Sequence, residues 1–236
     1  MGPVSDPKLR IPRFKWLAII VGSLSLVVIC HLLLVVATAT AQYDPPIVVI
    51  NELQYHPLSD DHGEEYVELY NTSTITADVS GWSFSDGIRY TFPPSTTIPP
   101  GGYLVVGHDP TTVETVYGVT GVLGPFESGR LANEGERVAI DDAGGRLVDE
   151  VTYDDHPPWP ELPDGKGPSL ELINPTFDND RPCSWAASQP VETSLGTPGV
   201  QNSVYSTDNV PPCVTGVTHT PAFPTSDQAV TVTAFV

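Results

Sequence analysis

The segment 50–86 constrains the fold more than any other part of this sequence. Apolar and polar residues alternate there in short runs, and turn residues separate the runs. In one run Val67 and Leu69 alternate with neighbours such as Glu68. Because successive side chains of a strand point to opposite faces, this pattern predicts half-buried β-strands joined by tight turns.

Turn residues divide the rest of the chain in the same way. The 236 residues include 25 Pro and 20 Gly, and turns are predicted at residues 99–102, 142–145 and 164–165. Eight strands are predicted, at Ile47 to Gln54, Tyr66 to Asn71, Gly81 to Ser85, Arg89 to Phe92, Tyr103 to Gly107, Glu136 to Asp141, Leu147 to Tyr153 and Ser169 to Ile173. This spacing predicts an all-β sandwich of two antiparallel sheets, and no helix is expected outside an apolar stretch near the N-terminus.

Large aromatic residues are expected to complete the core of this sandwich. Gly81 and Trp82 belong to a Ser-Gly-Trp turn that reverses the chain between two strands. Trp82 is expected to fill the core or its edge, as are Trp159 and Trp185, because large aromatic side chains dominate sandwich interiors.

Glu52 and Glu68 lie on two strands that can be neighbours in a sheet. A close pair of carboxylates can perform general acid–base catalysis, or each can hydrogen-bond an adjoining turn. The sequence contains no Gly-x-Ser-x-Gly, no His-Glu-x-x-His and no phosphate-binding loop. We therefore favour the structural interpretation and predict no catalytic residue and no cofactor.

Six motifs follow one another in a recognisable order. They read INELQYHP, GEEYVELYN, VSGWSFSDG, YTFPPSTTIPPGGYLVV, LANEGERVAIDDAGGRLVDEVTY and KGPSLELINP. In this order, over residues 45–202, the chain resembles the lamin tail domain in its bacterial, secreted form. The resemblance implies an immunoglobulin-like β-sandwich that binds or links and has no catalytic residues. Eukaryotic relatives lie in nuclear filaments and contact proteins and chromatin, whereas bacterial ones belong to exported, multidomain proteins.

An uncharged, mostly apolar stretch begins at Trp16 and ends at Ala37. It can cross a bilayer core of about 30 Å at about 1.5 Å per residue. Basic residues precede it, which predicts an N-terminus inside the cell and export of the remainder; they are Lys8, Arg10, Arg13 and Lys15. The small-x-small sequence at residues 39–41 resembles a signal-peptidase site, so residues 1–42 are either a membrane anchor or a cleaved signal peptide.

The charge of the exported part limits its partners. The whole chain carries a formal net charge of −19, and after the apolar stretch 28 acidic residues face only six basic ones. Nucleic-acid affinity rests on Lys and Arg, so nucleic acid is an unlikely partner. The acidic residues form either a simple solvated surface or one that attracts cations and basic surfaces.

The loop after the first predicted strand concentrates acidic side chains. Asp60, Asp61, Glu64 and Glu65 lie within six residues, and Ca²⁺ takes six to eight oxygen ligands. The spacing differs from that of an EF-hand, and acidic loops are also common on acidic surfaces, so a calcium site and a plain surface loop both remain open. Residues 178–180 and the group Asp154-Asp155-His156 are weaker candidates, since Asx side chains often cap turns.

The C-terminal part differs from the sandwich. Residues 203–212 are polar and predict a linker. Residues 213–236 alternate strongly and predict the start of a second immunoglobulin- or fibronectin-like module; two strands cannot bury a core, so this module is expected to be truncated. Cys183 and Cys213 flank the end of the sandwich and can form a disulfide in an oxidising compartment, which would join the second module to the first.

Together these features predict an exported, membrane-anchored, non-catalytic binding or scaffolding module of a bacterial cell-surface protein, whose partner is a protein or a cell-envelope component. Two alternatives stay open. The domain can be the accessory part of a secreted nuclease or hydrolase whose catalytic part lies beyond Val236, or it can be a calcium-dependent adhesion module.

Overall fold

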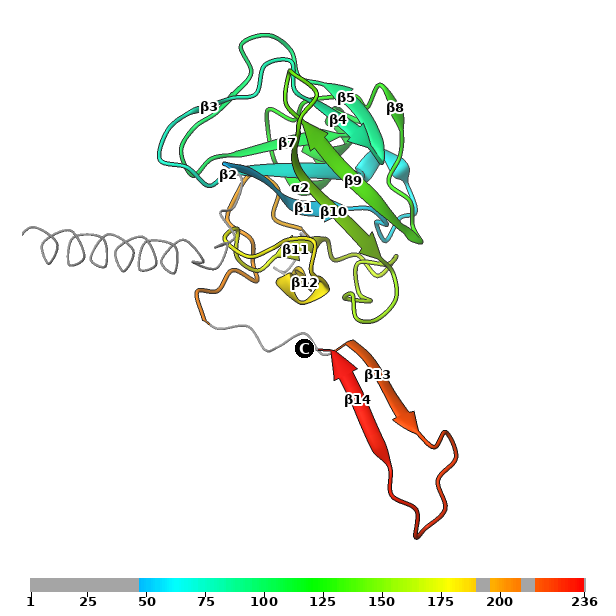
Figure 1. The fold of residues 1–236 in the computed structure, drawn as a ribbon. Helices are drawn as coiled ribbons and strands as arrows, with labels where there is room; N and C mark the ends of the chain where they lie inside the picture. Colours follow the sequence, from blue (N-terminus) through cyan, green and yellow to red (C-terminus); the bar gives the residue numbers. More distant parts are fainter. Residues whose placement is uncertain (1–46, 190–195, 209–214, 236) are drawn as a thin grey trace, which may run out of the picture. The chain divides into compact units, whose positions relative to one another are not determined.

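Two antiparallel five-stranded sheets face each other across one hydrophobic core (Figure 1). The structure is a computed structural model that describes residues 47–189, 196–208 and 215–235. The chain divides into two units, Met1–Asp44 and Pro45–Val236, and all described residues belong to the second.

The first sheet has the strand order β12-β11-β1-β2-β7. Its strands are β12 (Trp185–Ala187), β11 (Leu170–Leu172), β1 (Val48–Gln54), β2 (Tyr66–Asn71) and β7 (Tyr103–Gly107). All seven residues of β1 are buried, which requires that both faces of this sheet be covered.

The second sheet has the strand order β10-β9-β4-β5-β8. Its strands are β10 (Leu147–Asp154), β9 (Gly135–Asp141), β4 (Ser83–Asp86), β5 (Ile88–Thr91) and β8 (Ser128–Gly129). In β10 Asp149, Val151 and Tyr153 are buried while the residues between them are partly or fully exposed, so one face of this sheet meets the core and the other meets solvent.

The core between the sheets is built from alternate residues of both. Leu53 and Leu69 of the first sheet and Phe84, Ile140 and Tyr153 of the second are no more than 1% exposed. Burial of each such side chain stabilises the fold by about 1.5–3 kcal/mol. The described strands confirm the all-β sandwich, and the eight predicted strands are present as β1, β2, β4, β5, β7, β9, β10 and β11.

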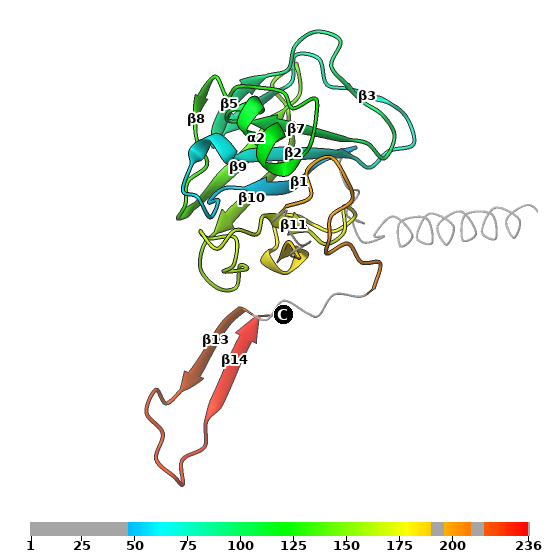
Figure 2. The same cartoon turned by 180° about the vertical axis from the view of Figure 1, so that it is seen from behind.

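Short elements join these strands. They are the two-stranded pair β3 (Ala77–Asp78) and β6 (Thr97–Ile98), the 3-10 helices η1 (His62–Glu64) and η2 (Pro182–Ser184), and α2 (Pro110–Tyr117). In Figure 2, α2 lies in front of the first sheet, on the face away from the second sheet.

The expectation that the chain after the apolar stretch has no helix is wrong, because α2 forms there. The side chain of Asp109 accepts hydrogen bonds from the backbone N–H groups of Thr111 and Thr112 and caps the helix, and Pro110 occupies its first turn. The helix ends at Gly118, whose φ of 69° is left-handed. These capping signals are visible in the sequence, but eight residues are too few to show helical periodicity.

A bulge in β1 links the two sheets. The register between β1 and β2 shifts between Ile50 and Glu52. The backbone N–H of Ile50 donates to the carboxylate of Asp149 at 2.7 Å, and the side chain of Asn179 donates to the same carboxylate at 2.7 Å. Burial raises the pKa of Asp149 to about 7. Asn179, a candidate calcium ligand in the sequence, is therefore a buried donor that supports the bulge.

The aromatic residues of the core divide into two groups. Trp159 and Trp185 are 8% and 3% exposed, as predicted for core residues. Trp82 is only partly buried and packs against the edge of the core, after the turn at Gly81, whose φ of 73° favours glycine. Phe84, two residues later on β4, occupies the interior.

The last described residues form a hairpin of β13 (Thr215–Thr220) and β14 (Thr231–Phe235). It contains the two strands that were predicted for the start of a second module. In the part of the chain that the structure describes, no helix is long and apolar enough to span a bilayer. The apolar stretch from Trp16 to Ala37 lies outside the described residues, so the membrane anchor and signal peptide stay predictions.

Replacing Phe84 by Ala is expected to lower the free energy of unfolding by about 3–5 kcal/mol, because the ring is fully buried in the core. Trp82→Ala is expected to cost about 1–2 kcal/mol, because its ring is partly solvated at the edge of the core. Chemical denaturation of residues 43–208 measures both losses. A larger loss for Trp82→Ala than for Phe84→Ala would contradict this assignment of the core.

Candidate functional site

Three glutamates lie side by side on the first sheet. Glu52 on β1 is paired in register with Glu68 on β2 and with Glu171 on β11, so all three side chains share one face. Each is 0% exposed. We call these three residues the glutamate cluster. The predicted neighbourhood of Glu52 and Glu68 is confirmed, and Glu171 adds a third carboxylate.

The polypeptide that covers this face is residues 196–206, which we call the strap; it is orange in Figures 1 and 2, beside β1 and β11. The glutamate cluster accepts hydrogen bonds from three backbone N–H groups of the strap. Thr197 donates to Glu52 at 2.8 Å, Gly199 to Glu68 at 2.5 Å, and Val204 to Glu171 at 3.1 Å. The strap therefore binds through its backbone at three points along the sheet.

Side chains of the sheet and of the strap provide further donors. Tyr66 and Ser169 donate their hydroxyls to Glu52, each at 2.6 Å. Thr197 and Ser203 of the strap donate theirs to Glu171 at 2.7 and 2.8 Å. The contacts of Thr197 and Ser203 add to the attachment of the strap, whereas those of Tyr66 and Ser169 hold the carboxyl group of Glu52 in place.

Two asparagines extend the attachment into the bulge of β1. Asn51 donates its amide to Glu68 at 2.8 Å and to the side-chain oxygen of Asn202 at 2.7 Å. Asn202 in turn donates to the backbone carbonyls of Asn51 and Leu172, at 3.0 and 2.8 Å. Ser206 donates its N–H to the carbonyl of Ile173, so the hydrogen bonds continue beyond the predicted linker boundary at residue 203.

The electrostatics of the cluster are unusual because its carboxylates lack a cationic partner. Among the described residues, every ion pair involves other side chains. Burial, and then the neighbouring charge of Glu171, raises the pKa of Glu52 to about 7. Burial and the charge of Glu52 also raise the pKa of Glu68. The folded domain therefore holds protons that these groups release on unfolding near neutral pH.

The close approach of the strap requires glycine at residue 196. A Cβ atom there would collide with the hydroxyl of Tyr66 and would lie 2.9 Å from the carboxylate of Glu52. The backbone at Gly196 therefore lies closer to the cluster than a residue with a side chain could approach.

The loop that was considered for calcium uses its carboxylates in two ways. Asp61 accepts the N–H of Gly63 at 2.9 Å and caps η1. Glu65 is fully buried, accepts the N–H of Leu131 at 2.8 Å and contacts His62 Nδ1 at 2.5 Å. Asp60 is exposed, and Glu64 is partly exposed in η1. Glu65 thus fixes this loop to the second half of the domain, and calcium binding here stays a prediction.

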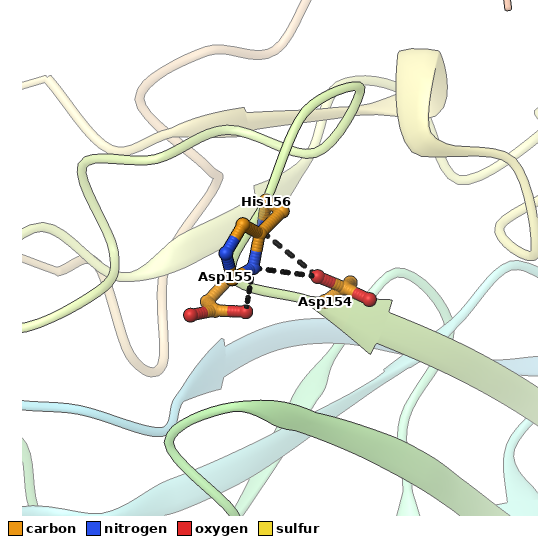
Figure 3. Close-up of side chains that lie close together, drawn as sticks. All are labelled: Asp154, Asp155 and His156. Atoms are coloured by element: carbon orange, nitrogen blue, oxygen red, sulfur yellow. Dashed lines mark hydrogen bonds and ion pairs between the residues drawn. The ribbon is translucent and has the colours of Figure 1, made fainter. Parts of the chain in front are cut away.

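One group of three side chains in the described ranges has ligand atoms within 4.8 Å of one another, namely Asp154, Asp155 and His156 (Figure 3). His156 Nδ1 lies 2.5 Å from Asp155 Oδ1 and 3.4 Å from Asp154 Oδ1. The hydrogen bond to Asp155 raises the pKa of His156. The imidazole of His156 is thus held by contacts within this exposed group, and metal binding there stays a prediction.

The sequence could not place every site residue. Glu171 has a recognisable signal, since an acidic residue between Leu170 and Leu172 marks the non-core face of a strand. The strap that covers this face has no such signal, because three of its contacts with the glutamates come from backbone N–H groups that any residue except proline can supply. The predicted disulfide stays a prediction, since Cys213 lies outside the described residues.

The domain is expected to be less stable at pH 7.5 than at pH 5. The pKa values of Glu52 and Asp149 rise from about 4.5 and 3.8 in the unfolded chain to about 7 in the fold. The folded state therefore binds more protons across this window, and stability falls as pH rises through it. Denaturation of residues 43–208 at both pH values measures the difference.

The variant Glu52→Gln is expected to reduce this loss by about 1–3 kcal/mol, because it removes one of the groups that must ionise. Glu134→Gln, on an exposed residue, is the matched control and should leave the pH dependence unchanged. Stability that rises between pH 5 and pH 7.5, or an equal effect of both variants, would contradict the role of the glutamate cluster.

Comparison with known families agrees with this architecture. The family model described as Lamin Tail Domain matches residues 41–155, which include β1 to β10 and both Glu52 and Glu68. Strand β11, with Glu171, and the strap follow the matched region. No curated protein matches the chain. The match confirms the resemblance that the six sequence motifs indicated. The chain is thus a protein that contains a lamin tail domain.

Proposed function

We propose that this chain is an exported, membrane-anchored, non-catalytic binding or scaffolding module of a cell-surface protein. The observation that carries the proposal is the attachment of the strap to the glutamate cluster. A module that links other parts of a protein needs a fixed geometry between its body and the polypeptide that leaves it. The hydrogen bonds at Glu52, Glu68 and Glu171 supply such a fixed exit.

The environment of the buried carboxylates supports a non-catalytic role. A general acid or base must reach the proton that it transfers, directly or through one water molecule. Glu52 and Glu68 are fully covered by the strap, and their oxygens accept hydrogen bonds from the fold itself. The raised pKa values of Glu52 and Glu68 follow from burial beneath the strap. The hydrogen bonds of these two residues to the strap stabilise one arrangement of the chain.

The surface charge supports an extracytoplasmic role and limits the partner. The excess of 28 acidic over six basic residues after the apolar stretch keeps an exported domain soluble and repels nucleic acid. Protein or cell-envelope partners with neutral or basic surfaces fit this charge. The basic residues before Trp16 and the apolar stretch up to Ala37 support insertion with the N-terminus inside.

The topology is testable with reporters fused after Asp208, which retains the strap. An enzyme that is active only in the cytoplasm is expected to be silent in this fusion, and one that is active only after export is expected to be active. Removal of residues 1–42 should reverse both results, because the signal for export is then lost. Full activity of the cytoplasmic reporter in the intact fusion would exclude export.

Membrane fractionation of the same fusion separates the two fates of the N-terminus. An anchored chain is expected to stay with the membrane after a high-salt wash, with its first residues intact by mass spectrometry. A chain that is released and begins at Gln42 would instead show cleavage, and the module would then be secreted.

A further inference from the structure

The outer edge of β7 is only half covered. Residues of an antiparallel strand alternate in direction, so Leu104 bonds to β2 while Tyr103 and Val105 direct their backbone groups outward. The carbonyl of Val105 accepts the N–H of Leu123, and the N–H of Gly107 donates to the carbonyl of Leu123, each at 2.9 Å. Leu123 therefore covers the C-terminal half of this edge.

The cover stops before the N-terminal half of the strand. The side chain of Glu114 on α2 accepts the N–H groups of Gly121 and Val122, at 2.7 and 3.1 Å, so these groups bond to the helix and do not continue the ladder along β7. Within the described ranges no backbone partner is found for the outward N–H and C=O of Tyr103 or the N–H of Val105. These three groups form a short unpaired strand edge, at which Tyr103 is partly exposed and Val105 is 4% exposed.

This unpaired edge lies in a groove of about 600 Å³, a volume typical of ligand sites. Its walls come from β7, from the loop after α2 and from the strap, and they include Tyr103, Leu104, Tyr117, Val119, Pro198 and Val200. None of the described residues that line the groove is charged. Val200 is 57% exposed, so an apolar side chain is available to a ligand without rearrangement of the fold.

We propose that this groove binds an extended peptide segment of a partner protein, which adds a strand beside β7. An added strand pairs its backbone with exposed N–H and C=O groups and places alternate side chains in adjoining pockets. The segment has small or β-branched uncharged side chains at its centre, because the walls are uncharged and apolar. The inference rests on the proposed binding function and gives the chemistry of the partner.

Charge favours a partner with basic residues on either side of this centre. The chain carries a net charge of −19, and after the apolar stretch 28 acidic residues face six basic ones. Lys or Arg beyond the ends of the groove would be attracted, whereas a second copy of this chain brings the same negative charge. A heterologous peptide is therefore favoured over edge-to-edge pairing of two copies.

The first experiment uses the full chain in detergent and a dye-labelled peptide, Lys-Lys-Thr-Val-Thr-Val-Thr-Lys-Lys. Saturable binding in fluorescence anisotropy is expected. Two further peptides carry N-methyl groups on the Thr residues or on the Val residues. Because only one of these sets faces β7, one methylated peptide should bind at least tenfold more weakly than the other. Equal affinity of both, or no binding up to about 1 mM peptide, would overturn the proposal.

Amide hydrogen exchange locates the peptide on the strand. Saturation with peptide is expected to slow exchange at Tyr103 and Val105 at least tenfold. Leu104 and Val106 are internal controls, because their N–H groups already bond to β2 and should change little. Slower exchange at other residues of the chain, without slower exchange at these two amides, would exclude a strand added to β7.

Variants test the groove without disturbing the core. Tyr103→Pro removes one outward N–H and no bond to β2, and Val200→Lys places a positive charge on an exposed wall; each is expected to weaken binding about tenfold. Ile75→Lys, at a residue that is 68% exposed and does not line the groove, should bind as the unmodified chain does. Unchanged binding by both groove variants would overturn the assignment.

Two results separate this inference from the proposed function. Sedimentation without peptide is expected to find no self-association that Tyr103→Pro abolishes; a dimer lost in that variant would replace the peptide by a second copy. The reporter fusions concern export alone. If the fusions show no export while the peptide binds, the proposed peptide groove is supported and the proposed export is wrong. If the fusions show export and the peptide does not bind, only the proposed peptide groove is wrong.

Discussion

The burial of three carboxylates without a cation is the constraint on which the outer face of the first sheet depends. Removing such groups from water costs several kcal/mol each unless hydrogen bonds replace the lost solvation. In this domain donors of the sheet and the strap replace it at Glu52, Glu68 and Glu171. The glutamate cluster therefore needs the strap to supply its hydrogen-bond donors, and the strap is held in place by the same hydrogen bonds.

This arrangement favours specificity over maximal stability. An apolar face would bind a covering segment at many positions, whereas carboxylates accept hydrogen bonds only where donors lie at the correct distance. Asn51 and Asn202 reinforce the selection, since each donates to the other's segment. The raised pKa values of Glu52 and Glu68 reflect the cost of this choice. The strap, which is held on this face of the sheet, also forms one wall of the groove beside β7.

The sequence predicts the sandwich better than it predicts the site. Strands β1, β2, β9 and β10 are long, alternate clearly and end at turn residues, so their positions are confirmed within two residues. Helix α2 was not predicted, because its capping residues enclose only eight positions. The pairing of Glu52 with Glu68 follows from adjacent strands. The strap does not, since its bonds to Glu52 and Glu68 come from backbone N–H groups and join residues more than 100 positions apart.

The position of the strap has a consequence for where this domain ends. The family match ends at residue 155, after β10, yet the strap partners of Glu52 and Glu68 are Thr197 and Gly199. A protein trimmed to the matched region would keep both glutamates on β1 and β2 but lose β11, Glu171 and every strap donor. The carboxylates of Glu52 and Glu68, which are buried in the complete domain, would then be exposed to solvent on an uncovered sheet. The smallest self-sufficient unit, by this reasoning, extends at least as far as Ser206.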